Sequence, residues 1–240
     1  MAQNRPQPHS GQAAKQGRLT AQPVQPGMEA APTGLHQLDL DGPRDGLLYV
    51  PASYRADRPA PLVLTLHGAG GDARSSLAPL QLVANMTGLL LLAPDSRRQT
   101  WDIIMGGYGT DVTFIDRALE QIFSRYAVDP THLAIGGFSD GASYALSLGL
   151  TNGDLFTHII AFSPGFMAPA RREGSPHIFV SHGTRDAVLP IEKCSRRLVP
   201  QLKREGYDVL YREFDGPHTV PIPIVREAWN WFTDRPDGAS

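Results

Sequence analysis

The stretch that decides the fold is residues 133–146, which read LAIGGFSDGASYAL. It begins with an apolar run typical of a buried strand and ends with small and apolar residues that favour a helix. Between the two, Gly137, Ser139 and Gly141 complete a G-x-S-x-G pattern. At a strand-to-helix junction this pattern predicts a very tight turn that exposes the serine hydroxyl, because side chains at the two glycine positions would collide with the turn.

A glycine-rich turn with a solvated serine is the alternative interpretation. Glycine makes up 24 of the 240 residues, so a G-x-S-x-G pattern arises by chance with a frequency of roughly 0.1. The position between strand and helix favours a nucleophile. A serine hydroxyl is a poor nucleophile until a base removes its proton, so the chemistry requires a histidine nearby.

Short apolar runs alternate with helical patterns over the rest of the chain. Strands are predicted at residues 47–50, 61–66, 88–93, 132–136, 157–163, 177–181 and 208–214. Helices are predicted at residues 76–86, 115–126, 141–150, 191–205 and 224–232. This alternation predicts an α/β fold with a mostly parallel, doubly wound sheet, helices on both faces and no large cap domain. Chemistry in such sheets gathers at the carboxyl ends of the strands.

Residues 1–34 differ in composition from the rest of the chain. They are rich in Gln, Pro, Ala and Gly and contain few large apolar residues, so they bury too little surface to offset their ordering entropy. We expect a disordered tail or an expression-derived extension there, and a single domain over residues 35–240. Residues 1–18 lack the apolar core of a secretory signal, which makes a cytoplasmic location the default expectation.

The overall composition excludes several classes of partner. The net charge is −2 and charged residues make up 19% of the chain, which argues against nucleic acid or an anionic membrane as partner. No apolar stretch approaches the roughly 20 residues of a membrane-spanning helix. The single cysteine, Cys194, offers neither an internal disulfide nor a metal site, and we expect no metal.

When a serine nucleophile lies at such a strand-to-helix turn, the acid and then the histidine follow it along the chain. This order predicts the partners of Ser139. Asp186 ends the segment FVSHGTRD (179–186), which follows a predicted strand, and His218 lies in FDGPHT (214–219), which follows the last one. Both turns belong to the carboxyl edge of the sheet. There, Asp186 would hold the imidazole of His218 in the correct tautomer for proton transfer.

Other acids and bases are weaker candidates. Asp215 precedes His218 by three residues and is more typical of a loop-capping carboxylate. His182 fits a buried turn histidine, while His158 and His177 begin strands and so belong to the opposite edge. The side chain of Asp140 would cap the helix or face solvent.

A glycine-rich loop follows an earlier strand, in HGAGG (67–71). Acyl transfer requires fixed donors for a developing oxyanion. The expected donors are the backbone N–H of Asp140 and that of Ala69, with Gly70 as the runner-up. A nucleotide-binding loop is the alternative, but the run lacks the Lys-Ser/Thr ending of a P-loop and the glycine spacing of a dinucleotide fingerprint.

Five residues near these loops are candidates for a substrate pocket. For the first three, core packing is the competing interpretation. The candidates are Trp101, Met105, Tyr108, Leu189 and Val220.

Four motifs in order, LHGAGG (66–71), GFSDG (137–141), HGTRD (182–186) and GPH (216–218), resemble the phospholipase/carboxylesterase group of α/β-hydrolases over residues 46–232. The resemblance implies a compact hydrolase that cleaves carboxylic esters of modest acyl length without a cofactor. The group often has glutamine where this chain has Asp140, which leaves the subfamily open. Polyhydroxybutyrate-depolymerase-like and feruloyl-type esterases are similar, as is the dienelactone-hydrolase branch, whose nucleophile is cysteine.

The sequence therefore predicts a serine ester hydrolase that acts on small to medium acyl or aryl esters through an acyl-enzyme. Feruloyl or polyhydroxybutyrate-type esters, and peptide or thioester substrates, use the same machinery and stay open. From a different class, the chain could be a ligand-binding protein on a hydrolase scaffold that has lost catalysis. The expected partner is a small-molecule ester, and the oligomeric state is not predicted.

Overall fold

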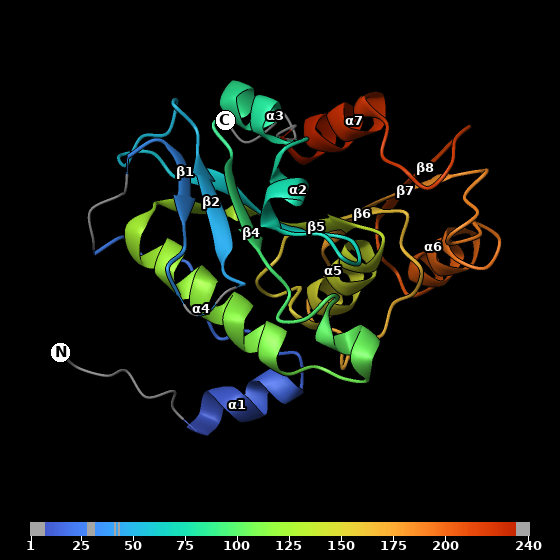
Figure 1. The fold of residues 1–240 in the computed structure, drawn as a ribbon, viewed down its shortest axis with the longest axis horizontal. Coiled ribbons are helices and arrows are strands. Elements are labelled where there is room, and N and C mark those ends of the chain that lie inside the picture. The colour runs from blue at the N-terminus through green and yellow to red at the C-terminus, as the bar shows by residue number, and fades with distance from the viewer. Residues whose placement is uncertain (1–7, 28–31, 41, 43, 234–240) are drawn as a thin grey trace.

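The computed structural model describes residues 8–27, 32–40, 42 and 44–233 (Figure 1). Its strands are β1 (Gly34–Gln37), β2 (Gly46–Val50), β3 (Ala60–Leu66), β4 (Leu90–Pro94), β5 (Val128–Phe138), β6 (His158–Phe162), β7 (His177–Gly183) and β8 (Val209–Phe214). Its helices are α1 (Pro8–Lys15), α2 (Ala73–Leu77), α3 (Gln81–Thr87), the short 3₁₀-helix η1 (Asp102–Met105), α4 (Thr110–Arg125), α5 (Asp140–Thr151), α6 (Ser195–Arg204) and α7 (Ile222–Thr233).

The strands form one sheet in the order β1-β2-β4-β3-β5-β6-β7-β8. The strands from β4 to β8 in this order are parallel, while β2 is antiparallel to β4 and β1 to β2. The predicted mostly parallel sheet is therefore confirmed. Parallel neighbours place the ends of β3, β5, β7 and β8 at one edge, where the loops that carry the candidate site residues begin.

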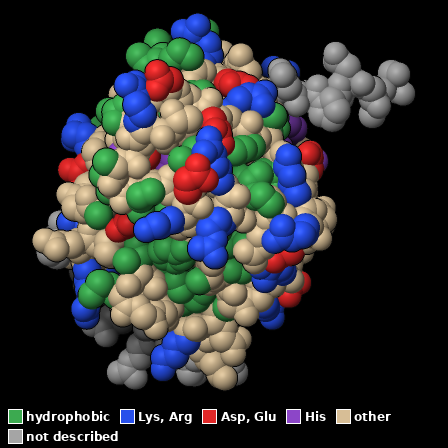
Figure 2. All heavy atoms as spheres, turned by 90° about the vertical axis from the view of Figure 1, so that its right-hand side faces the viewer, with side chains coloured by type: hydrophobic (Ala, Val, Ile, Leu, Met, Phe, Trp, Pro, Cys, Tyr) green, Lys and Arg blue, Asp and Glu red, His purple; other side chains and the backbone are tan. Residues whose placement is uncertain are grey.

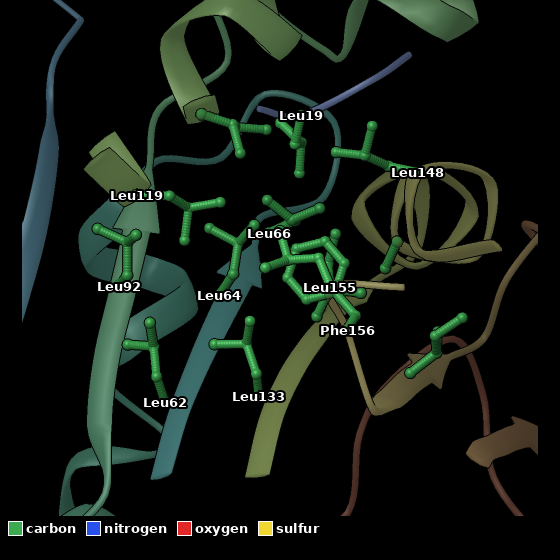
Figure 3. Packing of buried hydrophobic residues seen from close by; sticks show 14 of the residues in the cluster. Leu19, Leu62, Leu64, Leu66, Leu92, Leu119, Leu133, Leu148, Leu155 and Phe156 are labelled. Carbon is green, nitrogen blue, oxygen red and sulfur yellow. The ribbon is translucent and has the colours of Figure 1, made fainter. Parts of the chain in front are cut away.

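Helices cover both faces of the sheet (Figure 1). Alternate residues of β3 face opposite cores: Leu62, Leu64 and Leu66 join the core beneath α4 and α5, whereas Val63 joins the core beneath α2 and α7. Figure 3 shows the three leucines packed toward Leu119 of α4 and Leu148 of α5. This double burial explains why the central strands are continuous apolar runs rather than alternating ones.

The predicted helix at residues 76–86 is in fact two short helices. Asp72 caps α2 by accepting a hydrogen bond from the Ser75 N–H at 2.8 Å. Pro79 lies between α2 and α3, where its missing N–H and the restriction on the preceding residue interrupt helical hydrogen bonding. The other predicted helices and all seven predicted strands are present, with their ends shifted by up to a few residues. β1, α1 and the short helix η1 were not predicted.

The prediction of a disordered tail over residues 1–34 is wrong for residues 8–27. Leu19 and Ala21 are buried in the main core. The Leu19 N–H donates to Asn152 Oδ1 at 3.0 Å, and Arg18 forms a two-point ion pair with Asp154 at 2.8 and 2.7 Å. These partners lie more than 130 residues away, so no local pattern indicates them. Residues 1–7 and 28–31 of the predicted tail are outside the described residues.

Charges of both signs are mixed on the face shown in Figure 2, around a hydrophobic area in the lower half of the view. This mixture agrees with the small net charge of the chain. No helix among the described residues is long and apolar enough to cross a membrane.

Candidate active site

Ser139 lies at the tight junction between β5 and α5, in a backbone conformation with a positive φ that non-glycine residues rarely adopt (φ 58°, ψ −120°). The flanking glycines make this junction possible. A Cβ at Gly137 would lie 2.6 Å from the carbonyl oxygen of Leu66, and a Cβ at Gly141 would lie 2.2 Å from the same atom. Any side chain at either position would therefore force β3 and α5 apart, as the sequence pattern predicts.

The loops after β7 and β8 bring Asp186 and His218 to this junction. His218 Nε2 lies 2.9 Å from Ser139 Oγ, and His218 Nδ1 lies 2.5 Å from Asp186 Oδ2. The two loops are joined directly, because the Arg185 N–H donates to the Gly216 carbonyl at 3.0 Å. The structure thus brings the three predicted side chains into one hydrogen-bonded chain, the arrangement of a serine, an imidazole base and an orienting carboxylate.

The Asp186 carboxylate has partners on both of its oxygens. Oδ1 accepts the N–H groups of Val188 and Leu189 at 2.9 and 2.8 Å, while Oδ2 faces His218 and also lies 3.2 Å from His182 Nε2. Burial by itself raises the pKa of Asp186, but the hydrogen bonds from Leu189 and His218 outweigh it and hold that pKa below its usual value. The group therefore stays ionised and can stabilise a protonated imidazole.

The competing acid and bases lie elsewhere, as the sequence analysis favoured. Asp215 forms an ion pair with Arg185 at 2.8 Å, and its side chain is 80% exposed. His182 is fully buried, with Nδ1 2.7 Å from Ser195 Oγ and Nε2 2.8 Å from the Leu189 carbonyl. Burial lowers the pKa of His182. The ring is therefore neutral, and its role is to contact Asp186 Oδ2 as a structural neighbour.

The loop after β3 has a fixed peptide plane next to Ser139. The carbonyl oxygen of Gly68 accepts from His67 Nδ1 at 2.7 Å and from the Gly71 N–H at 3.0 Å. Because a trans peptide is planar, the N–H of Ala69 points opposite to this carbonyl. That N–H has no hydrogen-bond partner within the described part of the chain, which leaves it available to a ligand.

Gly70 does not offer the same possibility. Its N–H donates to the carbonyl of Gln99 at 2.8 Å, so the runner-up donor is already occupied. Asp140, in contrast, is the first residue of α5, where backbone N–H groups have no acceptor within the helix. The geometry thus favours Ala69 and Asp140 over Gly70.

His67 is a functional candidate that sequence reasoning missed, although it stands directly before the glycine-rich run. Its ring is buried, and Nε2 accepts from the Ser96 N–H at 3.0 Å. Burial lowers the pKa of His67, so the ring is neutral with its proton on Nδ1, the atom that faces the Gly68 carbonyl. His67 therefore sets the orientation of the Gly68–Ala69 peptide.

The pocket prediction is wrong for Trp101. This side chain is fully buried; it stacks on Tyr144 with ring centroids 5.1 Å apart and donates from Nε1 to the His67 carbonyl at 2.9 Å. Trp101 thus supports the loop instead of lining a pocket. In the same segment, the Thr100 hydroxyl donates to Asp140 Oδ2 at 2.6 Å. The Asp140 side chain therefore binds the neighbouring loop, and α5 has no side-chain cap.

The other four pocket candidates divide between two places. Met105 and Tyr108 line a polar cavity of about 350 Å³ that neither Ser139 nor His218 borders. Val220 lines a different, mainly apolar cavity of about 330 Å³ that His218 does border. Leu189 lines neither cavity, and its backbone serves Asp186 and His182 instead. Within the described residues no group of three or more metal-ligating side chains could hold a metal ion.

Comparison with known proteins agrees with this architecture. A probable feruloyl esterase C of Aspergillus niger is 29% identical over 178 residues, covering 70% of this chain and 64% of that protein. The feruloyl esterase C of Emericella nidulans is 27% identical over 175 residues, with the same two coverages. The chain thus matches less than two thirds of the length of these relatives.

Solved structures of esterases share the fold. The crystal structure of esterase PE8 has a TM-score of 0.62 and 25% identity, and the match covers 77% of this chain and 97% of that one. A ferulic acid esterase from Anaeromyces mucronatus, solved in complex with ferulic acid, has a TM-score of 0.65 at 18% identity, covering 86% and 91%. The sheet, the helices on both faces and the loop-borne site define an α/β-hydrolase fold.

The family model for phospholipase/carboxylesterase proteins matches residues 90–219, which is more than half of the chain. The chain therefore belongs to the phospholipase/carboxylesterase family. The matched residues run from β4 to the His218 loop and include Ser139, Asp186 and His218, whereas the His67 loop lies before them.

Proposed function

We propose that this chain hydrolyses carboxylic esters, with Ser139 as the nucleophile, His218 as the proton carrier and Asp186 as the orienting carboxylate. The observation that carries the proposal is the continuous hydrogen-bonded chain from Ser139 Oγ through both nitrogens of His218 to Asp186 Oδ2. Membership of the phospholipase/carboxylesterase family supports the same reaction class.

The reaction proceeds through two tetrahedral intermediates. Ser139 Oγ attacks the ester carbonyl carbon while His218 Nε2 takes the hydroxyl proton of Ser139. The oxyanion that forms accepts hydrogen bonds from the backbone N–H groups of Ala69 and Asp140. His218 then gives the proton to the leaving alcohol oxygen, and the C–O bond breaks to leave an acyl-enzyme. Water, deprotonated by the same imidazole, attacks the acyl carbon, and the proton returns to Ser139 as the acid leaves.

The substrates we propose are esters of small to medium acyl or aryl acids. A feruloyl-type ester is a specific candidate, because four of the relatives are named feruloyl esterase C or probable feruloyl esterase C. Those names describe proteins that this chain matches over less than two thirds of their length, so hydroxycinnamate esters belong in the test alongside simple esters.

A substrate panel tests the proposal. Turnover of p-nitrophenyl esters of increasing acyl length, methyl ferulate, a thioester and a peptide is measured with wild-type protein, Ser139→Ala and the exposed control Ser53→Ala. We expect ester turnover that falls by about 10⁴-fold or more in Ser139→Ala and is unchanged in Ser53→Ala. Retention of most activity in Ser139→Ala would overturn the assignment. No turnover of any substrate by wild type would favour the ligand-binding alternative.

A further inference from the structure

A cavity of about 330 Å³ lies between the sheet, α2 and α7, next to the catalytic histidine. We call it the α2–α7 cavity. Its volume falls in the range of small-molecule pockets. Its inner wall is apolar and comes from the strands, from α7 and from the segment between α2 and α3: Val63, Leu80, Ile160, Phe162, Val225 and Trp229.

The mouth of the α2–α7 cavity is within reach of the nucleophile. His218, Gly68 and Phe138 border it. The rings of Phe138 and His218 lie 4.6 Å apart at their centroids, and a Cβ built on Gly68 would lie 3.4 Å from Ser139 Cβ. A group attached to a carbonyl at Ser139 therefore needs to extend by only a few atoms to enter the cavity.

The proton transfer at His218 decides whether the acyl part or the alcohol part of an ester enters the α2–α7 cavity. When the C–O bond breaks, His218 Nε2 must donate its proton to the alcohol oxygen, so the alcohol leaves on the His218 side. The carbonyl oxygen points instead toward the N–H groups of Ala69 and Asp140. The α2–α7 cavity is lined by His218, Thr219 and Val220, and its wall also includes His67 and Gly68 of the loop after β3. Its border with His218 places it on the alcohol side of the scissile bond.

The walls also indicate the polarity of the occupant. Of the four hydroxyl groups at the cavity, those of Ser75 and Ser76 already donate to the carbonyls of Asp72 and Ala73. The other side-chain donors at the cavity, apart from the His67 and His218 rings, are the hydroxyls of Thr65 and Thr219 and the indole N–H of Trp229. A polyhydroxylated alcohol would lose more hydrogen bonds to water than these few groups replace, at a cost for each unpaired group. An aryl or branched alkyl group loses none and gains from leaving water.

We propose that the α2–α7 cavity binds the alcohol part of the substrate and selects an apolar alcohol, such as a benzyl or branched alkyl alcohol. This inference rests on the proposed ester hydrolysis and adds the identity of the leaving group. Val225, on the inner wall in α7, is the specificity-determining residue most open to a size change. Its side chain is buried, and it lies in α7, seven residues after His218, without being one of the three catalytic residues.

The test compares methyl and benzyl esters of one acid. Both esters form the same acyl-enzyme, so the hydrolysis of that intermediate is common to them, and any difference arises in acylation. In Val225→Phe, kcat/KM for the benzyl ester should fall at least tenfold relative to the methyl ester. Ile222→Phe is the matched control, because Ile222 is exposed on the same helix and outside the cavity; there the ratio should not change.

Further measurements separate the possible failures. Val225→Ala, which enlarges the cavity, should shift the ratio toward larger alcohols and replaces Val225→Phe if that variant fails to fold by thermal melting. An equal loss for methyl and benzyl esters, or a change confined to acyl-length preference at fixed alcohol, would overturn the cavity assignment while ester hydrolysis stands. If wild type hydrolyses neither ester, the proposed function itself fails.

Discussion

Histidines occupy both edges of the same sheet, with very different surroundings. At the carboxyl edge, His218 lies between a hydroxyl and a carboxylate, and His182 lies behind that carboxylate. At the opposite edge, His132, His158 and His177 stand on neighbouring strands, with ring centroids 6.3 and 5.4 Å apart. The rings of this second group pack against one another instead of bridging a nucleophile and an acid.

The surroundings of His158 explain the difference. Its ring packs edge-on against Trp231 and Phe232, with centroids 5.1 and 5.0 Å away. Burial, and then the charges of His177 and His132, lower the pKa of His158 to about 4. The ring is therefore neutral and structural near pH 7. The comparison teaches that the partners of an imidazole, rather than the number of imidazoles, decide whether an edge of the sheet can transfer protons.

The largest expected effect comes from removing one histidine at each edge. His218→Ala should lower kcat by about 10⁵-fold, because Ser139 loses its base. His177→Ala removes a ring at the other edge, and kcat should stay within about twofold of wild type. Steady-state kinetics on one p-nitrophenyl ester measures both. Comparable losses in the two variants would erase the distinction between the edges.

Two aspartates sharpen the comparison within the carboxyl edge. Asp186→Asn keeps the shape of the side chain but removes the charge that stabilises a protonated His218, so kcat should fall by about 10³- to 10⁴-fold. Asp215→Asn breaks only an exposed ion pair with Arg185 and should leave kcat nearly unchanged. The reverse ranking would make Asp215 the acid.

A smaller effect is expected from His67, which acts through the Gly68–Ala69 peptide. His67→Phe should lower kcat by about 10- to 100-fold with little change in KM, since only an oxyanion donor is misplaced. Affinity for a trifluoromethyl ketone, which forms a tetrahedral adduct, should fall in parallel. His67→Asn, which can donate to the same carbonyl, should recover part of both. A change confined to thermal stability would show a purely structural role.

The smallest expected effect is a pH dependence of stability at the opposite edge. The folded-state pKa of His158 lies below the ordinary value of about 6.5, so the unfolded chain binds the proton more readily. Its stabilising contribution is complete above pH 6.5 and is lost as the pH falls toward 4. Allowing for partial exposure, wild type should lose about 1 kcal/mol more than His158→Phe between pH 7.5 and 4.5. Urea unfolding at both pH values measures this, and equal losses would refute it.

Much of this molecule could be predicted from sequence, because the deciding features are local or follow a strict order along the chain. The apolar run of β4 and the helical stripe of α4 follow from burial. The glycines around Ser139 follow from backbone collisions at 2.6 and 2.2 Å. The order Ser139, Asp186, His218 follows from parallel strands that end at one edge.

Other features depend on partners far away in the sequence. The segment at Leu19 is held by Asn152 and Asp116, and no window of residues around Leu19 contains that information. Trp101 looks like a pocket wall in sequence, but its Nε1 supports the carbonyl of His67. The role of His67 itself depends on the direction of one peptide plane, which a glycine-rich pattern does not specify.

The rate and position of labelling by a fluorophosphonate test the central claim most directly, which is that His218 activates Ser139 at the carboxyl edge. Peptide mapping by mass spectrometry should place the adduct on Ser139 in wild type and in His177→Ala at equal rates, and His218→Ala should label far more slowly. An adduct on another residue, or equally fast labelling of Ser139 without the His218 imidazole, would contradict the account.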